Sequence, residues 1–372
     1  MTASTSASAP GKLVLLGEYA VLYGGPAAVL AVNRRAQVAL RASDDTLWSV
    51  RSPGLSAAPA SFELRPDGCQ HWVAITEDEA STYRLLSCVL QSLTQAGLLN
   101  PATTTPAHID LDTRAFFEPT NGGAAKLGLG SSAALTVALS SAVVRWAGCG
   151  NALRDPFDWL ATVVAIHREF QGGRGSGIDL AASLFGGVLE YGLDAGGAPE
   201  IARPLTLPKG LFMLPVWTGR SADTGAFLGR LSERFRVDPQ GIHRTMNRLS
   251  ETSRRGIDAL SSSRVGDFLD EVRRFRRDLE DLGRQAAMPI LSAEHQRMLA
   301  LTPSPGVAYK PSGAGGGDLG LFLADSPEVL ESLAIAVRDA GFEPIDLAVD
   351  TTGLAEDPTR SPEDSPATRV YD

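Results

Sequence analysis

Lys126-Leu-Gly-Leu-Gly-Ser-Ser-Ala-Ala-Leu135 is a glycine-rich turn that runs directly into a stretch of small and apolar residues, 136–147. The two glycines of the turn permit a tight bend and let a ligand approach the backbone closely. Either serine can cap the following helix, whose first N–H groups are free and carry partial positive charge. The stretch therefore predicts a phosphate-binding loop, with a capped buried helix as the alternative.

Two better-known glycine motifs fit this loop poorly. A Walker loop needs Gly-Lys-Ser/Thr at the entry to the helix, whereas Lys126 precedes the glycines. Gly128-Leu-Gly-Ser-Ser-Ala133 matches the loose dinucleotide pattern, but that pattern follows a buried strand, and residues 119–125 have the composition of a loop. A Rossmann site is therefore disfavoured.

Length and composition limit the classes of function. The 372 residues suffice for two domains, and 44% of them are hydrophobic. The net charge of -9 argues against a nucleic-acid or membrane-surface partner, while a local basic pocket for an acidic metabolite stays open. Three widely spaced cysteines without a Cys-x-x-Cys pair disfavour disulfides and a zinc site and indicate a cytoplasmic protein. No apolar run reaches the ~20 residues that cross a bilayer.

The pattern of apolar and polar residues predicts an α+β fold. Strands are expected at 11–17, 27–32, 38–40, 47–50, 62–64, 109–111, 186–191, 211–217, 319–324 and 345–349, and helices at 82–96, 136–147, 155–166, 226–301 and 327–340. Residues 1–10 are expected to form a loose leader. Residues 194–199 have the composition of a domain boundary or a hairpin tip, which predicts domains at 1–193 and 194–352, followed by a mobile tail at 353–372.

Three segments far apart in the sequence each have the composition of a ligand-binding loop. They are Ala9-Pro-Gly-Lys-Leu-Val-Leu-Leu-Gly-Glu-Tyr-Ala-Val-Leu22, Gly128-Leu-Gly-Ser-Ser-Ala-Ala134 and Lys310-Pro-Ser-Gly-Ala-Gly-Gly-Gly-Asp318. Together, and in this order, they resemble the three motifs of the GHMP kinases. The resemblance extends from about residue 9 to residue 353. Gly-Glu-Tyr at 17–19 and Gly173-Arg-Gly-Ser-Gly-Ile-Asp179 are similar to the branch that acts on phosphomevalonate, although Ser-Gly-Ile-Asp also occurs in mevalonate kinases.

The resemblance implies a two-domain fold, with a ribosomal-protein-like N-terminal domain, a ferredoxin-like C-terminal domain and a ligand cleft between them. It implies that ATP and Mg²⁺ are the cofactors and that the γ-phosphate is transferred to phosphomevalonate, which gives diphosphomevalonate and ADP. Such chemistry needs mainly positioning and cancellation of charge. A homodimer is compatible with the resemblance.

The resemblance also implies roles for individual residues. Lys12 and Asp179 carry over as the catalytic pair, although a helix cap explains Asp179 equally well from local sequence. The loop that would hold the ATP phosphates consists of Gly128, Leu129, Gly130, Ser131, Ser132 and Ala133. The expected metal contacts are Ser132 and Glu169. The expected substrate contacts are Lys126, Arg174, Ser176, Arg220, Ser221, Thr224, Gly315 and Gly316.

Three other functions stay open at this point. Mevalonate kinase shares the fold and the phosphate donor but uses a hydroxyl acceptor. A decarboxylase of diphosphomevalonate also uses ATP. A catalytically silent family member that senses a metabolite would not need Lys12, Ser132 and Asp179 together.

Overall fold

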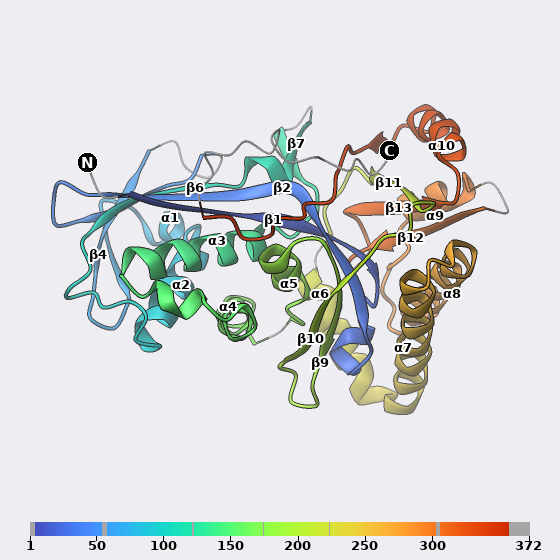
Figure 1. Cartoon of the computed structure of the whole chain (residues 1–372), viewed down its shortest axis with the longest axis horizontal. Coiled ribbons are helices and arrows are strands. Elements are labelled where there is room, and N and C mark those ends of the chain that lie inside the picture. The colour runs from blue at the N-terminus through green and yellow to red at the C-terminus, as the bar shows by residue number, and fades with distance from the viewer. Residues whose placement is uncertain are drawn as a thin grey trace.

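The structure is a computed structural model that describes residues 4–53, 58–120, 123–173, 175–222, 224–302 and 306–356. In this part of the chain, an eight-stranded sheet and a four-stranded sheet lie side by side (Figure 1). Helices cover both sheets, so the predicted α+β class is confirmed. None of the helices in these ranges is long and apolar enough to span a bilayer.

The larger sheet is built on two long paired strands near the N-terminus. Its strands are β1 (Ser4–Leu16), β2 (Ala27–Ala42), β3 (Trp48–Arg51), β4 (Ala60–Leu64), β5 (Gln70–Val73), β6 (Ala107–Asp112), β9 (Val188–Leu193) and β10 (Pro199–Leu205). Its order is β10-β9-β2-β6-β3-β4-β5, with β1 also paired to β2. The pair of β3 and β6 is parallel, and the other pairs among these described strands are antiparallel. The expected loose leader is wrong from Ser4 onward, because Ser4–Pro10 pairs with residues 35–41 of β2. The alternating small residues of this segment fit a strand whose partner lies elsewhere in the sequence.

Helices cover one face of this sheet. They are α1 (Glu77–Ser81), α2 (Arg84–Gln95), α3 (Ser131–Trp146), α4 (Pro156–Phe170) and α5 (Ile178–Phe185). The short 3-10 helices of this unit are η1 (Ala20–Tyr23), η2 (Arg114–Phe116) and η3 (Gly150–Leu153). The apolar residues at helical spacing in α2 are all buried, as expected for an amphipathic helix. Asp155 caps α4 by accepting from two backbone N–H groups, which confirms the predicted start of that helix. Where a loop was expected, β7 (Phe117–Thr120) pairs with β8 (Gly123–Lys126).

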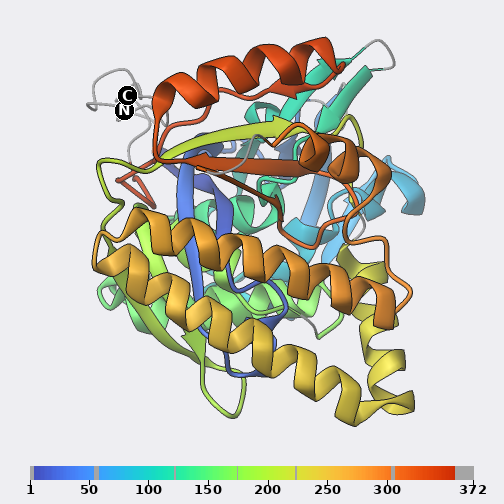
Figure 2. The ribbon, with the colours of Figure 1, turned by 90° about the vertical axis from the view of Figure 1, so that its right-hand side faces the viewer.

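The smaller sheet has helices on both faces. Its strands, in the order β12-β13-β11-β14, are β12 (Val307–Ser312), β13 (Leu319–Ala324), β11 (Phe212–Trp217) and β14 (Glu343–Pro344). The helices are α6 (Thr224–Val237), α7 (Pro239–Ser261), α8 (Val265–Gln285), α9 (Ala293–Ala300) and α10 (Pro327–Asp339). Figure 2 shows α7 and α8 lying antiparallel across one side of the sheet and α10 on the other. Alternate side chains of β13 enter two separate cores, one with α7 and α8 and one with α10.

The chain crosses between the two units twice. Residues 194–199 lie in the hairpin between β9 and β10, so the larger sheet continues to Leu205, beyond the expected boundary at 193. After β14 the chain returns to the first unit, where Val349 pairs with Val32 and Ala355 with Ser8. The first residues of the expected mobile tail, Gly353 to Glu356, are therefore docked, and residues 357–372 lie outside the described part of the chain. We propose that the domain boundary follows β10.

Candidate active site

The predicted phosphate-binding loop leads directly into the N-terminus of α3. Gly130, not a serine, is the N-cap residue, with φ of 78°, and no side chain accepts from the first N–H groups of the helix. Those N–H groups have no partner within the helix and are free to bind an anion. The capping role considered for Ser131 or Ser132 is therefore wrong: Ser131 begins the helix and is buried, and Ser132 contacts another helix.

Both loop glycines lie where a side chain would collide with the site. A Cβ at Gly128 would lie only 2.2 Å from Asp318 Cγ. A Cβ at Gly130 would lie 3.1 Å from Lys12 Cγ and 3.4 Å from Asp179 Oδ2. Positive φ angles of 77° and 78° also favour glycine at these positions. The loop thus packs directly against the two residues expected to be catalytic.

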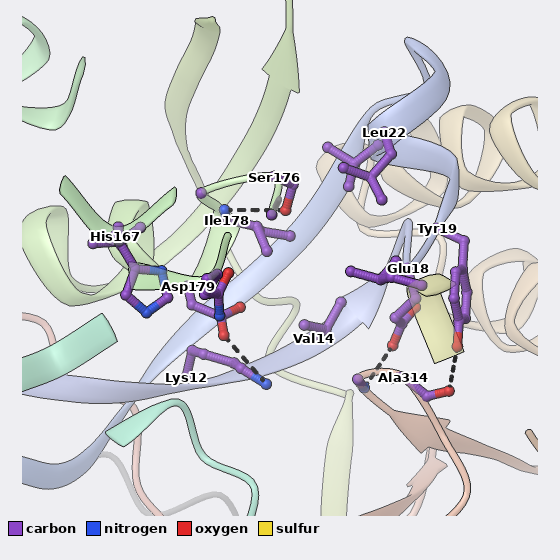
Figure 3. Close-up of a pocket in the computed structure, with 17 residues that line it drawn as sticks. Lys12, Val14, Glu18, Tyr19, Leu22, His167, Ser176, Ile178, Asp179 and Ala314 are labelled. Carbon is purple, nitrogen blue, oxygen red and sulfur yellow. Dashed lines mark hydrogen bonds and ion pairs between the residues drawn. The ribbon is translucent and has the colours of Figure 1, made fainter. Parts of the chain in front are cut away.

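Lys12 and Asp179 are brought together from distant parts of the sequence (Figure 3). Lys12 lies on β1, and its backbone N–H donates to Leu129 O of the loop at 2.9 Å. Its Nζ donates to Gly128 O at 3.2 Å and lies 3.9 Å from Asp179 Oδ2. The side chain of Lys12 is 8% exposed and that of Asp179 34%, so the carboxylate is the more accessible member of the pair.

Asp179 is held at the first turn of α5, immediately after a glycine-rich turn. Gly177 is the N-cap with φ of 85°, and a Cβ there would meet Val164 and the Tyr191 hydroxyl. The Tyr191 hydroxyl donates to Ser176 O at 2.6 Å, and Arg168 donates to Gly175 O at 2.9 Å. These contacts fix the turn that presents the carboxylate.

A pocket opens beside this ion pair, between the two units. It is lined by Lys12, Val14, Glu18, Tyr19, Val21, Leu22, His167, Gln171, Gly175, Ser176, Gly177, Ile178, Asp179, Leu180, Leu228, Gly313 and Ala314. In Figure 3, Lys12 and Asp179 point toward one another, with His167 beyond Asp179 and Tyr19 on the opposite side. The lining combines a charged pair with apolar walls, which suits a small acid with an aliphatic body.

The first and third motifs are joined beneath this pocket. Lys310 Nζ donates to Glu18 Oε1 and, at 3.2 Å, to Val14 O. Gly313 N–H also donates to Glu18 Oε1 at 3.2 Å, and the Tyr19 hydroxyl donates to Ala314 O at 2.6 Å. Burial lowers the pKa of Lys310, against the opposing effect of the Glu18 carboxylate. The ion pair therefore ties the two loops together.

Two further ionisable residues reach the site without having been predicted as ligands. His167 Nε2 lies 3.2 Å from Ser132 Oγ, and burial lowers the pKa of His167 to about 4, against the effect of Asp179. Burial raises the pKa of Asp318, whose Oδ1 accepts from Ala222 N–H at 3.0 Å. Asp318 could have been found from the sequence, because it ends the third motif. His167 lies in no motif, and only the helical register of α4 brings it to the site.

Some predicted site residues lie elsewhere. Glu169 accepts from Ser92 Oγ at 2.9 Å, on the side of α4 that faces α2, so the structure does not bring it to Ser132. Gly315 and Gly316 are buried against Ile290 and Phe227, and only Gly313 and Ala314 of that loop line the pocket.

The predicted substrate contacts divide into three groups. Ser176 lines the pocket, whereas Lys126 is exposed at the end of β8, next to the loop. The Ser221 hydroxyl donates to Lys126 O at 3.1 Å, and Arg220 lies 3.8 Å from Glu294 in an exposed pair. Arg174 and the side chain of Thr224 lie outside the part of the chain that the structure describes.

Comparison with known proteins bears on this arrangement. Residues 86–187 match the family model for the GHMP kinases N terminal domain. The phosphomevalonate kinase of Streptomyces sp. (strain CL190) is 29% identical to this chain, and the match covers 93% of this chain and 97% of that protein. Over residues 86–187 the chain is therefore similar to the GHMP kinases. The mevalonate kinase of Archaeoglobus fulgidus is 28% identical to this chain, and the match covers 87% of this chain and 94% of that protein.

The solved structures agree on the fold. The phosphomevalonate kinase of Streptococcus pneumoniae, in complex with phosphomevalonate and AMPPNP, superposes with a TM-score of 0.69 at 18% identity and covers 96% of this chain and 100% of that chain. The two-domain GHMP kinase fold, ribosomal-protein-like and then ferredoxin-like, is therefore confirmed. The similarity to GHMP kinases supports an ATP-dependent kinase.

Proposed function

We propose that this protein is a phosphomevalonate kinase, which transfers the γ-phosphate of ATP to the phosphate of phosphomevalonate and yields diphosphomevalonate and ADP. The observation that carries the proposal is the Lys12–Asp179 pair, which lies where the loop at the start of α3 meets the pocket. Similarity to phosphomevalonate kinases and mevalonate kinases alike supports the reaction class.

The site fits ATP and Mg²⁺. The uncapped N-terminus of α3 and the glycine backbone at 128–130 would hold the ATP phosphates. Among the described residues, no cluster of three or more His, Cys, Asp or Glu side chains could hold a metal ion alone. Oxygen ligands from Ser132, Asp179 and the phosphates are the kind that Mg²⁺ prefers. ATP supplies the phosphoryl group, and Mg²⁺ neutralises charge on it.

Lys12 and Asp179 would have different roles in the transfer. The Lys12 ammonium lies between the loop and the pocket, where it would offset repulsion between the donor and acceptor phosphates. At about 4 Å, two unit negative charges repel by roughly 4 kcal/mol at an effective dielectric near 20. The acceptor is already a largely ionised phosphate, so Asp179 orients Lys12 and the substrate and is not required as a strong base.

A phosphate acceptor is favoured over a hydroxyl by the charges around the loop. The charges of Lys12 and Lys126 both act to lower the pKa of Asp318, against the effect of burial. Within the described ranges, Lys126 takes part in none of the ion pairs. The exposed Arg220 side chain forms a weak ion pair with Glu294, so it can turn toward a ligand at little cost. Mevalonate would bring no phosphate group for these cations to bind.

The test is release of ADP with mevalonate, phosphomevalonate and diphosphomevalonate as separate acceptors. We expect kcat/KM for phosphomevalonate to exceed that for mevalonate by about a hundredfold or more, because a site built for a charged group discriminates strongly against its absence. Equal or better turnover of mevalonate would identify a mevalonate kinase. ADP release with diphosphomevalonate alone would indicate the decarboxylase, and no turnover with all three would favour the silent sensor.

A further inference from the structure

The His167 side chain occupies the place beside Ser132 for which a carboxylate was expected. His167 lies on α4, is 5% exposed and lines the pocket. Its Nε2 approaches Ser132 Oγ to 3.2 Å, and its ring packs against Phe170 with a centroid distance of 5.9 Å. Lys126 and Asp179 are the charged groups that influence the ring. An uncharged imidazole offers one donor and one acceptor nitrogen.

Ser132 lacks the hydrogen-bond partner that helical hydroxyl groups commonly use. Within α3, Thr136 donates to the carbonyl one turn earlier, Ser132 O, at 2.8 Å. For Ser132 the corresponding residue, Gly128, precedes the helix, and its carbonyl accepts from Lys12 Nζ. The side-chain partner of the Ser132 hydroxyl is thus His167 Nε2, which can accept the hydroxyl proton when the ring carries its own proton on Nδ1.

We propose that His167 is a positioning residue that accepts the Ser132 hydroxyl proton and thereby directs the Ser132 oxygen lone pairs toward the metal–nucleotide complex at the start of α3. This inference rests on the proposed function, because it requires nucleotide binding at that loop. A hydroxyl has one proton and two lone pairs, so donation to His167 leaves the oxygen able to act only as an acceptor or a metal ligand. His167 acts through Ser132 and needs no contact with the metal.

The test is a double-mutant cycle on nucleotide binding, with AMPPNP as the probe and calorimetry in the presence of Mg²⁺ or of EDTA. We expect His167→Leu, which keeps much of the volume, to weaken binding of Mg²⁺–AMPPNP about tenfold, the scale of one lost hydrogen bond. Ser132→Ala should cost about the same. The double variant should lose no more than either single variant, and binding in EDTA should change less than twofold. Additive losses, or equal losses with and without Mg²⁺, would overturn the proposal.

A second pair of variants covers the case in which His167→Leu does not fold. His167→Gln places an amide oxygen near the position of Nε2, whereas His167→Asn is one methylene shorter and does not reach Ser132. We expect Gln to retain affinity for Mg²⁺–AMPPNP within threefold and Asn to lose about tenfold. Equal affinities would refute the role of His167. Normal nucleotide binding with no turnover of phosphomevalonate would refute the proposed acceptor alone.

Discussion

Gly130→Ala is expected to disable the site through the contact that its new methyl group makes. Gly130 has φ of 78°, a conformation that costs a residue with a side chain about 1–2 kcal/mol. The added Cβ would lie 3.1 Å from Lys12 Cγ. Comfortable carbon contacts begin near ~3.5 Å, so Lys12 must move by about 0.4 Å or more. Because displacements approaching about 1 Å can cost 10²-fold in rate, we expect kcat to fall at least about tenfold.

Gly148→Ala is the matched control, at the other end of α3. Gly148 has φ of 76°, but a Cβ there would meet nothing within 4 Å. Both variants should therefore lose similar stability in thermal unfolding, while only Gly130→Ala loses activity in a steady-state ADP-release assay. Equal losses of activity in the two variants, or full activity in Gly130→Ala, would refute the proposed closeness of the loop to Lys12.

Three further predictions concern chemistry, the C-terminal segment and pH. Asp179→Asn should lower kcat by about 10²-fold, with nearly unchanged affinity for AMPPNP in calorimetry, and a loss below fivefold would demote Asp179. Asp350→Ala breaks a largely buried ion pair with Arg35 and should lower the free energy of unfolding in denaturant by about 3 kcal/mol. The control Asp346→Ala removes an exposed carboxylate and should lower it little. Equal losses in the two variants would argue against docking of the C-terminal segment. Burial lowers the pKa of His295 from 6.5 to about 4, so below pH 6.5 the unfolded chain takes up the proton first and stability is lost as the pH falls toward 4. By pH 5 the loss should reach about 2 kcal/mol relative to neutral pH, and His295→Gln should remove this component; parallel profiles would contradict the assignment.

The sequence was sufficient to predict the parts of the site that local pattern determines. The glycine loop before α3, the strand that carries Lys12 and the turn before Asp179 each have a composition that only a few backbone conformations accommodate. Their proximity in space does not follow from local pattern. It followed from the resemblance, and the structure places Lys12 Nζ 3.9 Å from Asp179 Oδ2.

The residue of α4 that lies beside Ser132 could not be predicted because it depends on helical register. Residues two apart on an α-helix point about 200° away from each other. His167 faces Ser132, so Glu169 must face away, toward Ser92 on α2. Choosing the carboxylate by residue type alone therefore selected the wrong face of α4.

Both chain ends were misjudged for a related reason. Residues 4–10 and 353–356 contain small and polar residues with little to bury, which is typical of mobile termini. Residues 4–10 instead pair with β2, and Ser8 and Ala355 also exchange N–H···O bonds at 2.7 and 2.8 Å. Such pairing across almost the whole chain length leaves no local trace in the sequence.

The proposed acceptor is a phosphate oxygen, and phosphorus NMR of the reaction products distinguishes it from a hydroxyl oxygen. With ATP, Mg²⁺ and phosphomevalonate, we predict that the monoester resonance disappears and that two mutually coupled resonances of a new diphosphate appear in step with ADP. With mevalonate under the same conditions, no new monoester resonance should form at a comparable rate. Formation of the monoester from mevalonate, with the phosphomevalonate resonance unchanged, would contradict the account.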